Sequence, residues 1–119
     1  MQRIFQITAW LLTLAIVTLS LVPAPARPTT IAGSGLEHFL IFLAVGVAFG
    51  FGHPRKPGLV ALALLIFAAC LEIAQASVPG RHARLSDFVV DGMASVLGVG
   101  LSSLYRNLSR QLFRNARDT

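Results

Sequence analysis

The sequence predicts an all-α fold: an integral membrane bundle of four transmembrane helices that continues into a basic amphipathic C-terminal extension. Two observations carry this prediction. The 119 residues are 55% hydrophobic and only 13% charged, with a mean hydropathy of +0.71, whereas a soluble domain of this size needs more polar side chains on its surface. Four long apolar runs are also separated by short connections rich in proline and glycine. The length allows one domain over 1–119.

The four runs have near-membrane length and cover residues 4–22, 36–52, 58–78 and 88–104. At about 1.5 Å per residue, each approaches the roughly 30 Å thickness of the hydrocarbon core. Because backbone polar groups in lipid must be satisfied within the segment, each run is predicted to be a helix. The connections at 23–28, 52–58 and 79–86 contain prolines or glycines and are too short to hold another domain.

The first run also has features of a secretory signal peptide. Arg3 precedes the apolar stretch, and Ala24-Pro25-Ala26 has the small residues of a cleavage site. However, the stretch is longer than the about 7–15 apolar residues of a signal core, and prolines surround the candidate site. We therefore expect a retained helix, which intact-mass measurement would test, because cleavage after Ala26 would leave three spans.

Basic residues predict the orientation of the bundle. With four spans, both termini share a side, and that side carries Arg3, Arg55, Lys56, Arg106, Arg110, Arg114 and Arg117. The other side carries only Arg27, Arg81 and Arg84. Because lysine and arginine are enriched in cytoplasmic segments, we expect both termini in the cytoplasm and the connection at 79–86 outside.

The tail at 105–119 continues a two-sided helical pattern that begins near residue 101. Its basic stripe consists of Arg106, Arg110, Arg114 and Arg117, and its apolar stripe of Leu101, Leu104, Leu108 and Leu112. Such a pattern is typical of a helix on an anionic membrane surface, so membrane lipids are the predicted partners. The basic residues are not interleaved with aromatic ones, which argues against nucleic acid.

Polar side chains gather at the predicted outer ends of three helices. They are Glu37, His38, Glu72, Gln75, Asp87 and Asp91, with Arg81 and Arg84 in the third connection. Residues three or four positions apart share a helical face, so Glu72 lies with Gln75 and Asp87 with Asp91. The face of Asp91 continues through small residues at 94 or 95, 98 and 102, which favour close helix packing. We therefore expect Asp91 to point into the bundle.

An unpaired carboxylate one turn inside the membrane, as expected for Asp91, costs up to about 2.5–3.5 kcal/mol. It should be neutral, reach a wet cavity, or pair with Arg81 or Arg84, whose guanidinium groups bind carboxylates through two hydrogen bonds. His38 could join this group as a proton donor or acceptor near neutral pH. The structural interpretation is that Ser86 or Asp87 caps the fourth helix and an Arg–Asp pair fixes the connection. We favour a shared polar site. Its candidate catalytic residues are Glu72, Asp87, Asp91 and His38, and its candidate substrate-binding residues are Gln75, Arg81 and Arg84.

Other kinds of site have little support in the sequence. It contains no Gly-rich phosphate loop, no Gly-x-Ser-x-Gly turn and no paired cysteines, so no cofactor is predicted. His38, Glu72 and Asp91 lack metal-binding spacing, and no metal is predicted. Gly46 and Gly50 are four residues apart and offer a small-residue face for a partner helix or a second copy of the chain.

The order of these residues resembles the VanZ-like family of small bacterial multi-helix membrane proteins, named for a member associated with teicoplanin resistance. The shared elements are His38-Phe39, Glu72-x-x-Gln75, Pro79-Gly80-Arg81 and Asp87-x-x-x-Asp91-x-x-Ala94-x-x-x-Gly98, over residues 36 to 100. The family usually has asparagine in place of Asp91 and glycine in place of Ala94, and its Asp-Lys pair before the histidine is replaced by Ser34-Gly35. The resemblance implies the bacterial inner membrane and an outward-facing polar site.

Three functions are compatible with these features. The first is binding or modification of an envelope lipid or glycan intermediate, in which arginines hold an anionic headgroup and carboxylates orient it or act as acid or base. The second is a non-enzymatic structural or accessory subunit whose polar cluster holds helices together. The third, a small proton- or ion-coupled transporter, ranks last because four short spans are few for transport. The sequence leaves open whether the protein is an enzyme.

Overall fold

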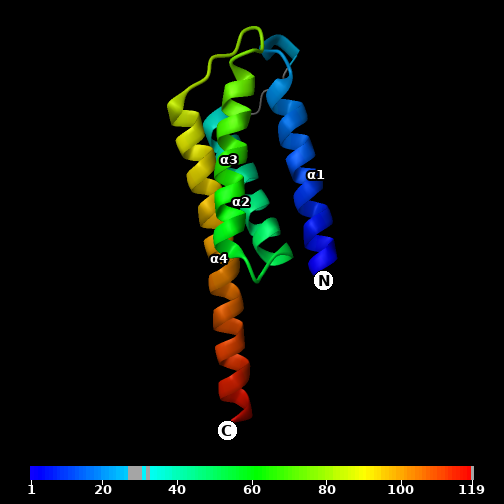
Figure 1. The fold of residues 1–119 in the computed structure, drawn as a ribbon, viewed down its shortest axis with the longest axis vertical. Helices are drawn as coiled ribbons and strands as arrows, with labels where there is room; N and C mark the ends of the chain where they lie inside the picture. Colours follow the sequence, from blue (N-terminus) through cyan, green and yellow to red (C-terminus); the bar gives the residue numbers. More distant parts are fainter. Residues whose placement is uncertain (27–30, 32, 119) are drawn as a thin grey trace.

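The computed structural model describes residues 1–26, 31 and 33–118, which form a bundle of four helices (Figure 1). The helices are α1 (Gln2–Leu21), α2 (Ser34–Gly52), α3 (Pro57–Gln75) and α4 (Leu85–Arg117), with the short 3-10 turn η1 (Ala24–Ala26) after α1. All four are long and apolar enough to cross a membrane. The prediction of an all-α membrane bundle with four spans is therefore confirmed.

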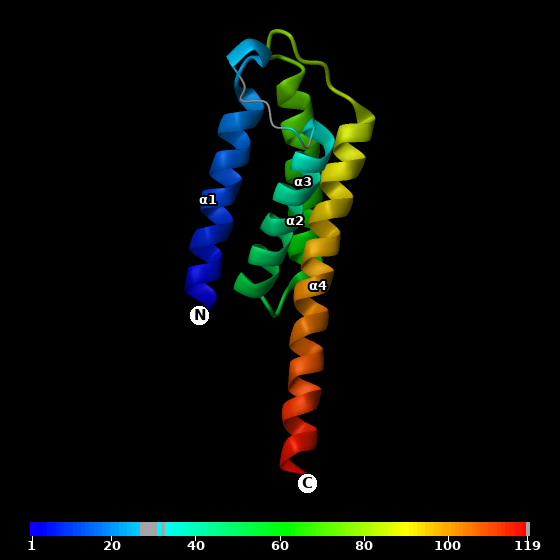
Figure 2. The same cartoon turned by 180° about the vertical axis from the view of Figure 1, so that it is seen from behind.

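The helices alternate in direction, so the bundle has two chemically different ends. At one end lie the connection 76–84 and η1, and we call this the loop end (Figure 1). At the other lie Met1 and the connection 53–56, and we call this the terminal end. The C-terminal part of α4 projects beyond the terminal end (Figure 2). Both termini are thus on the same side of the bundle, while the side of the membrane they occupy stays a prediction.

The helix that carries Asp87 and Asp91 begins earlier than expected. α4 starts at Leu85, and Arg84 occupies the N-cap position without a side-chain hydrogen bond. The expectation that Ser86 or Asp87 caps this helix was therefore wrong. Asp87 lies in the first turn instead, where a negative charge is stabilised by the unpaired N–H groups and the dipole of the helix.

The tightest packing in the bundle is between α2 and α4. A Cβ atom added at Gly46 would overlap the carbonyl oxygen of Ser95, and one added at Gly50 would overlap the side chain of Ser102. On the other side of this interface, a Cβ atom at Gly98 would lie 2.7 Å from the backbone nitrogen of Val47. Small residues let two helix backbones approach closely in lipid. The Gly46/Gly50 face is therefore occupied by α4 of the same chain, and a second copy would have to use another surface.

The interior is small and centred on α2, which lies between α1 and α4. Its buried side chains Phe42, Val45 and Phe49 pack with buried residues of the other three helices. Large apolar side chains such as Ile7, Ile66 and Met93 remain exposed on the outside. An apolar exterior around a small-residue interior is the arrangement that a lipid environment stabilises.

Beyond the bundle, α4 continues without a bend to Arg117 (Figures 1 and 2). Arg106 lies where the tail leaves the bundle, and its Nη1 donates a hydrogen bond of 2.6 Å to the carbonyl oxygen of Gly50. Its guanidinium carbon also lies 5.8 Å from the centre of the Phe51 ring. Arg106 therefore stabilises an otherwise unpaired carbonyl at the end of α2 rather than joining a lipid-facing stripe. That the tail lies on anionic lipid stays a prediction.

Candidate functional site

The polar centre of the loop end is a contact between α2 and α4. The Nδ1 atom of His38 lies 3.3 Å from Oδ2 of Asp91. The Asp91 side chain is 3% exposed and that of His38 is 15% exposed. Asp91 is buried because the α4 face that it shares with Ala94, Ser95 and Gly98 packs against α2. Its inward orientation was correctly predicted, and the partner that the structure gives it is His38, one of the groups that the sequence placed near it.

Glu72 holds the connection 76–84 to α3 through a hydrogen bond. This residue lies on the buried face of α3 and is 8% exposed. Its Oε1 atom accepts a hydrogen bond from the backbone N–H of Arg84, the residue that immediately precedes α4. The Arg84 side chain itself is exposed. The contact described for Arg84 uses its main chain, and substrate binding by its guanidinium group stays a prediction.

Arg81 links the same connection to α1. Its Nη1 atom donates a hydrogen bond to the carbonyl oxygen of Ser20, which lies in the last turn of α1 and is 3% exposed. The last four carbonyl groups of a helix have no partner within it, and a positive charge is favoured there by the helix dipole. This contact gives a structural reason for an arginine at the loop end, which carries fewer basic residues than the terminal end. The role of Ser20 could not be predicted from the sequence, because its backbone carbonyl and not its side chain makes the contact.

Three buried polar atoms at the loop end have no hydrogen-bond partner among the described residues. They are Oε1 of Glu37, Nε2 of Gln75 and Oδ1 of Asp91, which come from three different helices. A buried polar atom without a partner costs about 1–3 kcal/mol. Two of these atoms are acceptors and one is a donor, so each could form a hydrogen bond with a ligand group of the opposite kind.

A small cavity of about 80 Å³ lies between the loop-end halves of α1 and α2. Its polar wall consists of Ser20, Glu37 and His38, and the rest of its lining is apolar. Since a liquid water molecule occupies about 30 Å³, the cavity has room for two or three waters or for one functional group of a ligand. His38 contacts both this cavity and Asp91, so it is the residue through which a proton could pass between them.

The structure divides the predicted cluster into separate contacts. No group of three histidine, cysteine or acidic side chains in residues 1–26, 31 and 33–118 is arranged to hold a metal ion. His38 contacts Asp91, whereas Glu72 contacts the backbone of Arg84. Asp87 is half-buried and accepts only a long hydrogen bond of 3.4 Å from Ser86 among the described contacts. A catalytic role for Asp87 stays a prediction without geometric support.

Comparisons of the chain with protein-family models, with curated proteins and with solved structures find no match. The resemblance to the VanZ-like family thus rests on the order of residues in the sequence. The placement of those residues is what the structure adds. His38, Glu72, Gln75, Arg81 and Asp91 all lie at the loop end, on or between helices α2, α3 and α4.

Proposed function

We propose that this chain is a VanZ-like protein of the bacterial inner membrane with cytoplasmic termini, whose loop end binds or acts on an envelope lipid or glycan intermediate. One observation carries the proposal. Three polar atoms, from Glu37, Gln75 and Asp91, are buried at the loop end without a hydrogen-bond partner among the described residues. Ionisable and polar groups inside a membrane protein are costly, and they are characteristic of ligand, ion and proton sites.

The chemistry of these atoms favours a ligand rich in hydroxyl and amide groups. The carboxylates of Glu37 and Asp91 accept hydrogen bonds from hydroxyl groups, and the amide of Gln75 donates to a carbonyl or ether oxygen. The exposed guanidinium group of Arg84 is suited to a phosphate at the entrance. A glycan headgroup carried on an anionic lipid provides the hydroxyl groups, the carbonyl or ether oxygens and the phosphate that these residues would bind. If a reaction takes place, the His38–Asp91 pair is the candidate acid or base.

The alternative is an accessory subunit in which the cluster only holds helices together. Three contacts favour it: His38 with Asp91, Glu72 with Arg84, and Arg81 with Ser20. Each joins two elements of the bundle. This alternative gives no reason for retaining a buried amide nitrogen without a partner, and that difference allows a direct test.

The test is the substitution Gln75→Leu. Leucine has similar volume and removes the unpartnered amide, so the free energy of unfolding should stay equal or rise. The proposal predicts that Gln75→Leu fails to complement a deletion strain under glycopeptides and other envelope stresses, at normal membrane levels. The accessory-subunit alternative predicts full complementation.

A matched control is Gln6→Leu at the terminal end. The Nε2 atom of Gln6 donates a 2.9 Å hydrogen bond to the carbonyl oxygen of Gly52, so this substitution should lower stability by about 0.5–1.5 kcal/mol. Complementation should be normal once membrane levels are matched. In the same assay we expect alanine at Glu72, Arg81 or Asp91 to impair function. Full activity of Gln75→Leu and of all three alanine variants would refute the proposed site.

A further inference from the structure

The terminal end carries positive charge that the chain itself does not neutralise. Arg3, Arg55 and Lys56 are exposed there, and none of them takes part in an ion pair within the described residues. The acidic residues lie elsewhere: Glu37, Glu72, Asp87 and Asp91 are in the loop-end halves of their helices, and Asp118 follows α4. An anion is therefore the partner that electrostatics favours at the terminal end.

An apolar groove of about 290 Å³ opens beside this charge, between α1 and α3. Trp10 and Thr13 form its α1 wall, Val60, Ala63 and Phe67 form its α3 wall, and Phe49 of α2 lies between them. The groove exists because α1 packs mainly on α2 and stands away from α3 (Figure 1). The small side chain of Ala63 adds to the space.

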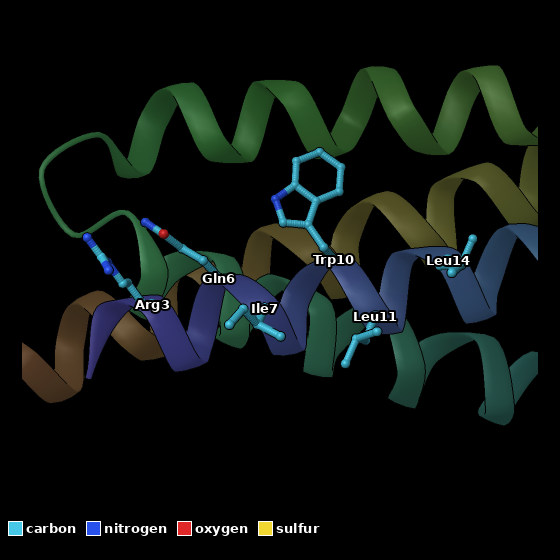
Figure 3. A pocket seen from close by; sticks show the side chains of 6 residues that line it. All are labelled: Arg3, Gln6, Ile7, Trp10, Leu11 and Leu14. Atoms are coloured by element: carbon cyan, nitrogen blue, oxygen red, sulfur yellow. The ribbon is translucent and has the colours of Figure 1, made fainter.

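Trp10 connects the groove to the basic residues. Its ring meets Phe49 edge-on, with ring centres 5.4 Å apart. A second hollow of about 550 Å³ shares Trp10 and extends along α1 to Arg3. Figure 3 shows Trp10 directed toward α3, with its indole nitrogen on the side nearer to Arg3. Trp10 therefore lies in the wall of both the groove and the hollow that leads to Arg3.

The mouth of the groove is held in place by contacts with the end of α2. Gln6 donates to the Gly52 carbonyl, and Arg3 and Gln6 both point toward the connection between α2 and α3 (Figure 3). His53 lines the groove and stacks on Phe49 with ring centres 6.0 Å apart. Imidazole and guanidinium donors thus lie at the terminal end of an otherwise apolar channel.

We propose that this groove is a lipid site that holds one acyl chain of an anionic phospholipid, with its phosphate against Arg3 and Lys56. The dimensions argue against a partner helix, because one helical turn about 10 Å wide and 5.4 Å long fills roughly 420 Å³, more than the groove of about 290 Å³. The apolar walls suit a hydrocarbon chain, and the unneutralised cations suit a phosphate. This site is at the opposite end of the bundle from the proposed function and does not depend on it.

The sole tryptophan of the chain, Trp10, reports directly on occupancy. The full-length protein is reconstituted in vesicles that mix phosphatidylcholine with phosphatidylglycerol, with bromine on the acyl chains of one lipid or of the other. Brominated phosphatidylglycerol should quench Trp10 fluorescence more strongly than its mole fraction predicts. Arg3→Gln should reduce the affinity of this lipid relative to phosphatidylcholine by about fivefold, the usual effect of one basic residue near a membrane.

Two further variants make the test specific. Arg114→Gln removes the same charge from the distant tail and should leave the quenching unchanged. Ala63→Leu keeps every charge but fills the groove, and should also reduce the preference for phosphatidylglycerol. Quenching by both lipids in proportion to their mole fractions would indicate ordinary lipid contact and would overturn the proposal. An Arg114→Gln effect equal to that of Arg3→Gln, or an unchanged preference in Ala63→Leu, would overturn it as well.

Discussion

Replacing Gly98 by alanine should force apart α2 and α4, the two most closely packed helices of the bundle. The added Cβ atom would lie 2.7 Å from the backbone nitrogen of Val47, and closer still to the carbonyl oxygen of Leu43. Ordinary contacts of a Cβ atom begin near 3.4 Å, so α4 would have to move by about 0.7 Å or more. Both obstructing atoms belong to the backbone, so no side-chain rotation can relieve the overlap.

The expected magnitude follows from comparison with Gly100 in the same helix. Overpacking of a tight interior costs typically about 1–3 kcal/mol, and the rigid backbone around Gly98 places this substitution toward the upper end. Gly100 is exposed, and a Cβ atom there would meet nothing within 4 Å. Alanine is favoured over glycine in a helix by about 0.5–1 kcal/mol. This gain is common to both glycine-to-alanine variants, so they should differ in stability by the overpacking cost alone, about 2–3 kcal/mol.

Unfolding of the two variants by a denaturing detergent, followed by helical circular dichroism in mixed micelles, measures this difference. Gly98→Ala should unfold at lower detergent fraction than the parent protein, and Gly100→Ala at the same or a higher one. Both changes add a single methyl group to α4, so effects on helix propensity and hydrophobicity are matched. Equal stability of the two variants would mean that α2 and α4 do not pack through Gly98, and the reasoning would be refuted.

Three further predictions concern contacts that fasten the bundle. A double-mutant cycle of His38→Ala and Asp91→Ala should give a coupling energy of about 0.5–3 kcal/mol by detergent unfolding; a value near zero would contradict the pair. Arg106→Met removes a donor to the end of α2 and should cost about 1 kcal/mol, whereas Arg110→Met in the same tail should change stability by less than about 0.5 kcal/mol. Glu72→Ala should accelerate amide hydrogen exchange in the α3–α4 connection by about tenfold or more. Unchanged exchange would show that the carboxylate does not hold that connection.

Much of the fold could be predicted because the residues that determine it act within a single helix. The four spans follow from length and apolarity. The burial of Asp91 follows from its spacing to small residues at 95, 98 and 102, since a face of small side chains in lipid is a face that packs. What this spacing does not specify is the partner. Gly46 and Gly50 also form a face of small residues that predicts close helix packing. The helix that packs against them is α4 of the same chain.

The contacts that the sequence did not predict involve the backbone. Arg81 and Arg84 were considered as partners of a carboxylate, because charge is visible in a sequence and the positions of free backbone groups are not. In the structure, Arg81 reaches the Ser20 carbonyl and Arg84 offers its N–H to Glu72. Arg106 likewise fits a basic stripe by spacing, yet it meets a carbonyl at the end of α2.

These contacts also change where a ligand of the loop end would bind. Arg81 holds the connection 76–84 to α1, and Glu72 holds it to α3. The polar atoms left for a ligand are therefore the buried ones of Glu37, Gln75 and Asp91. The cavity beside Glu37 and His38 has a volume of about 80 Å³, enough for two or three waters or one functional group. This space is smaller than a whole glycan headgroup, so we expect α1 to move away from α2 when such a headgroup binds. Hence a disulfide between these two helices near the loop end should abolish ligand binding without disturbing the fold, whereas one at the terminal end should leave binding intact.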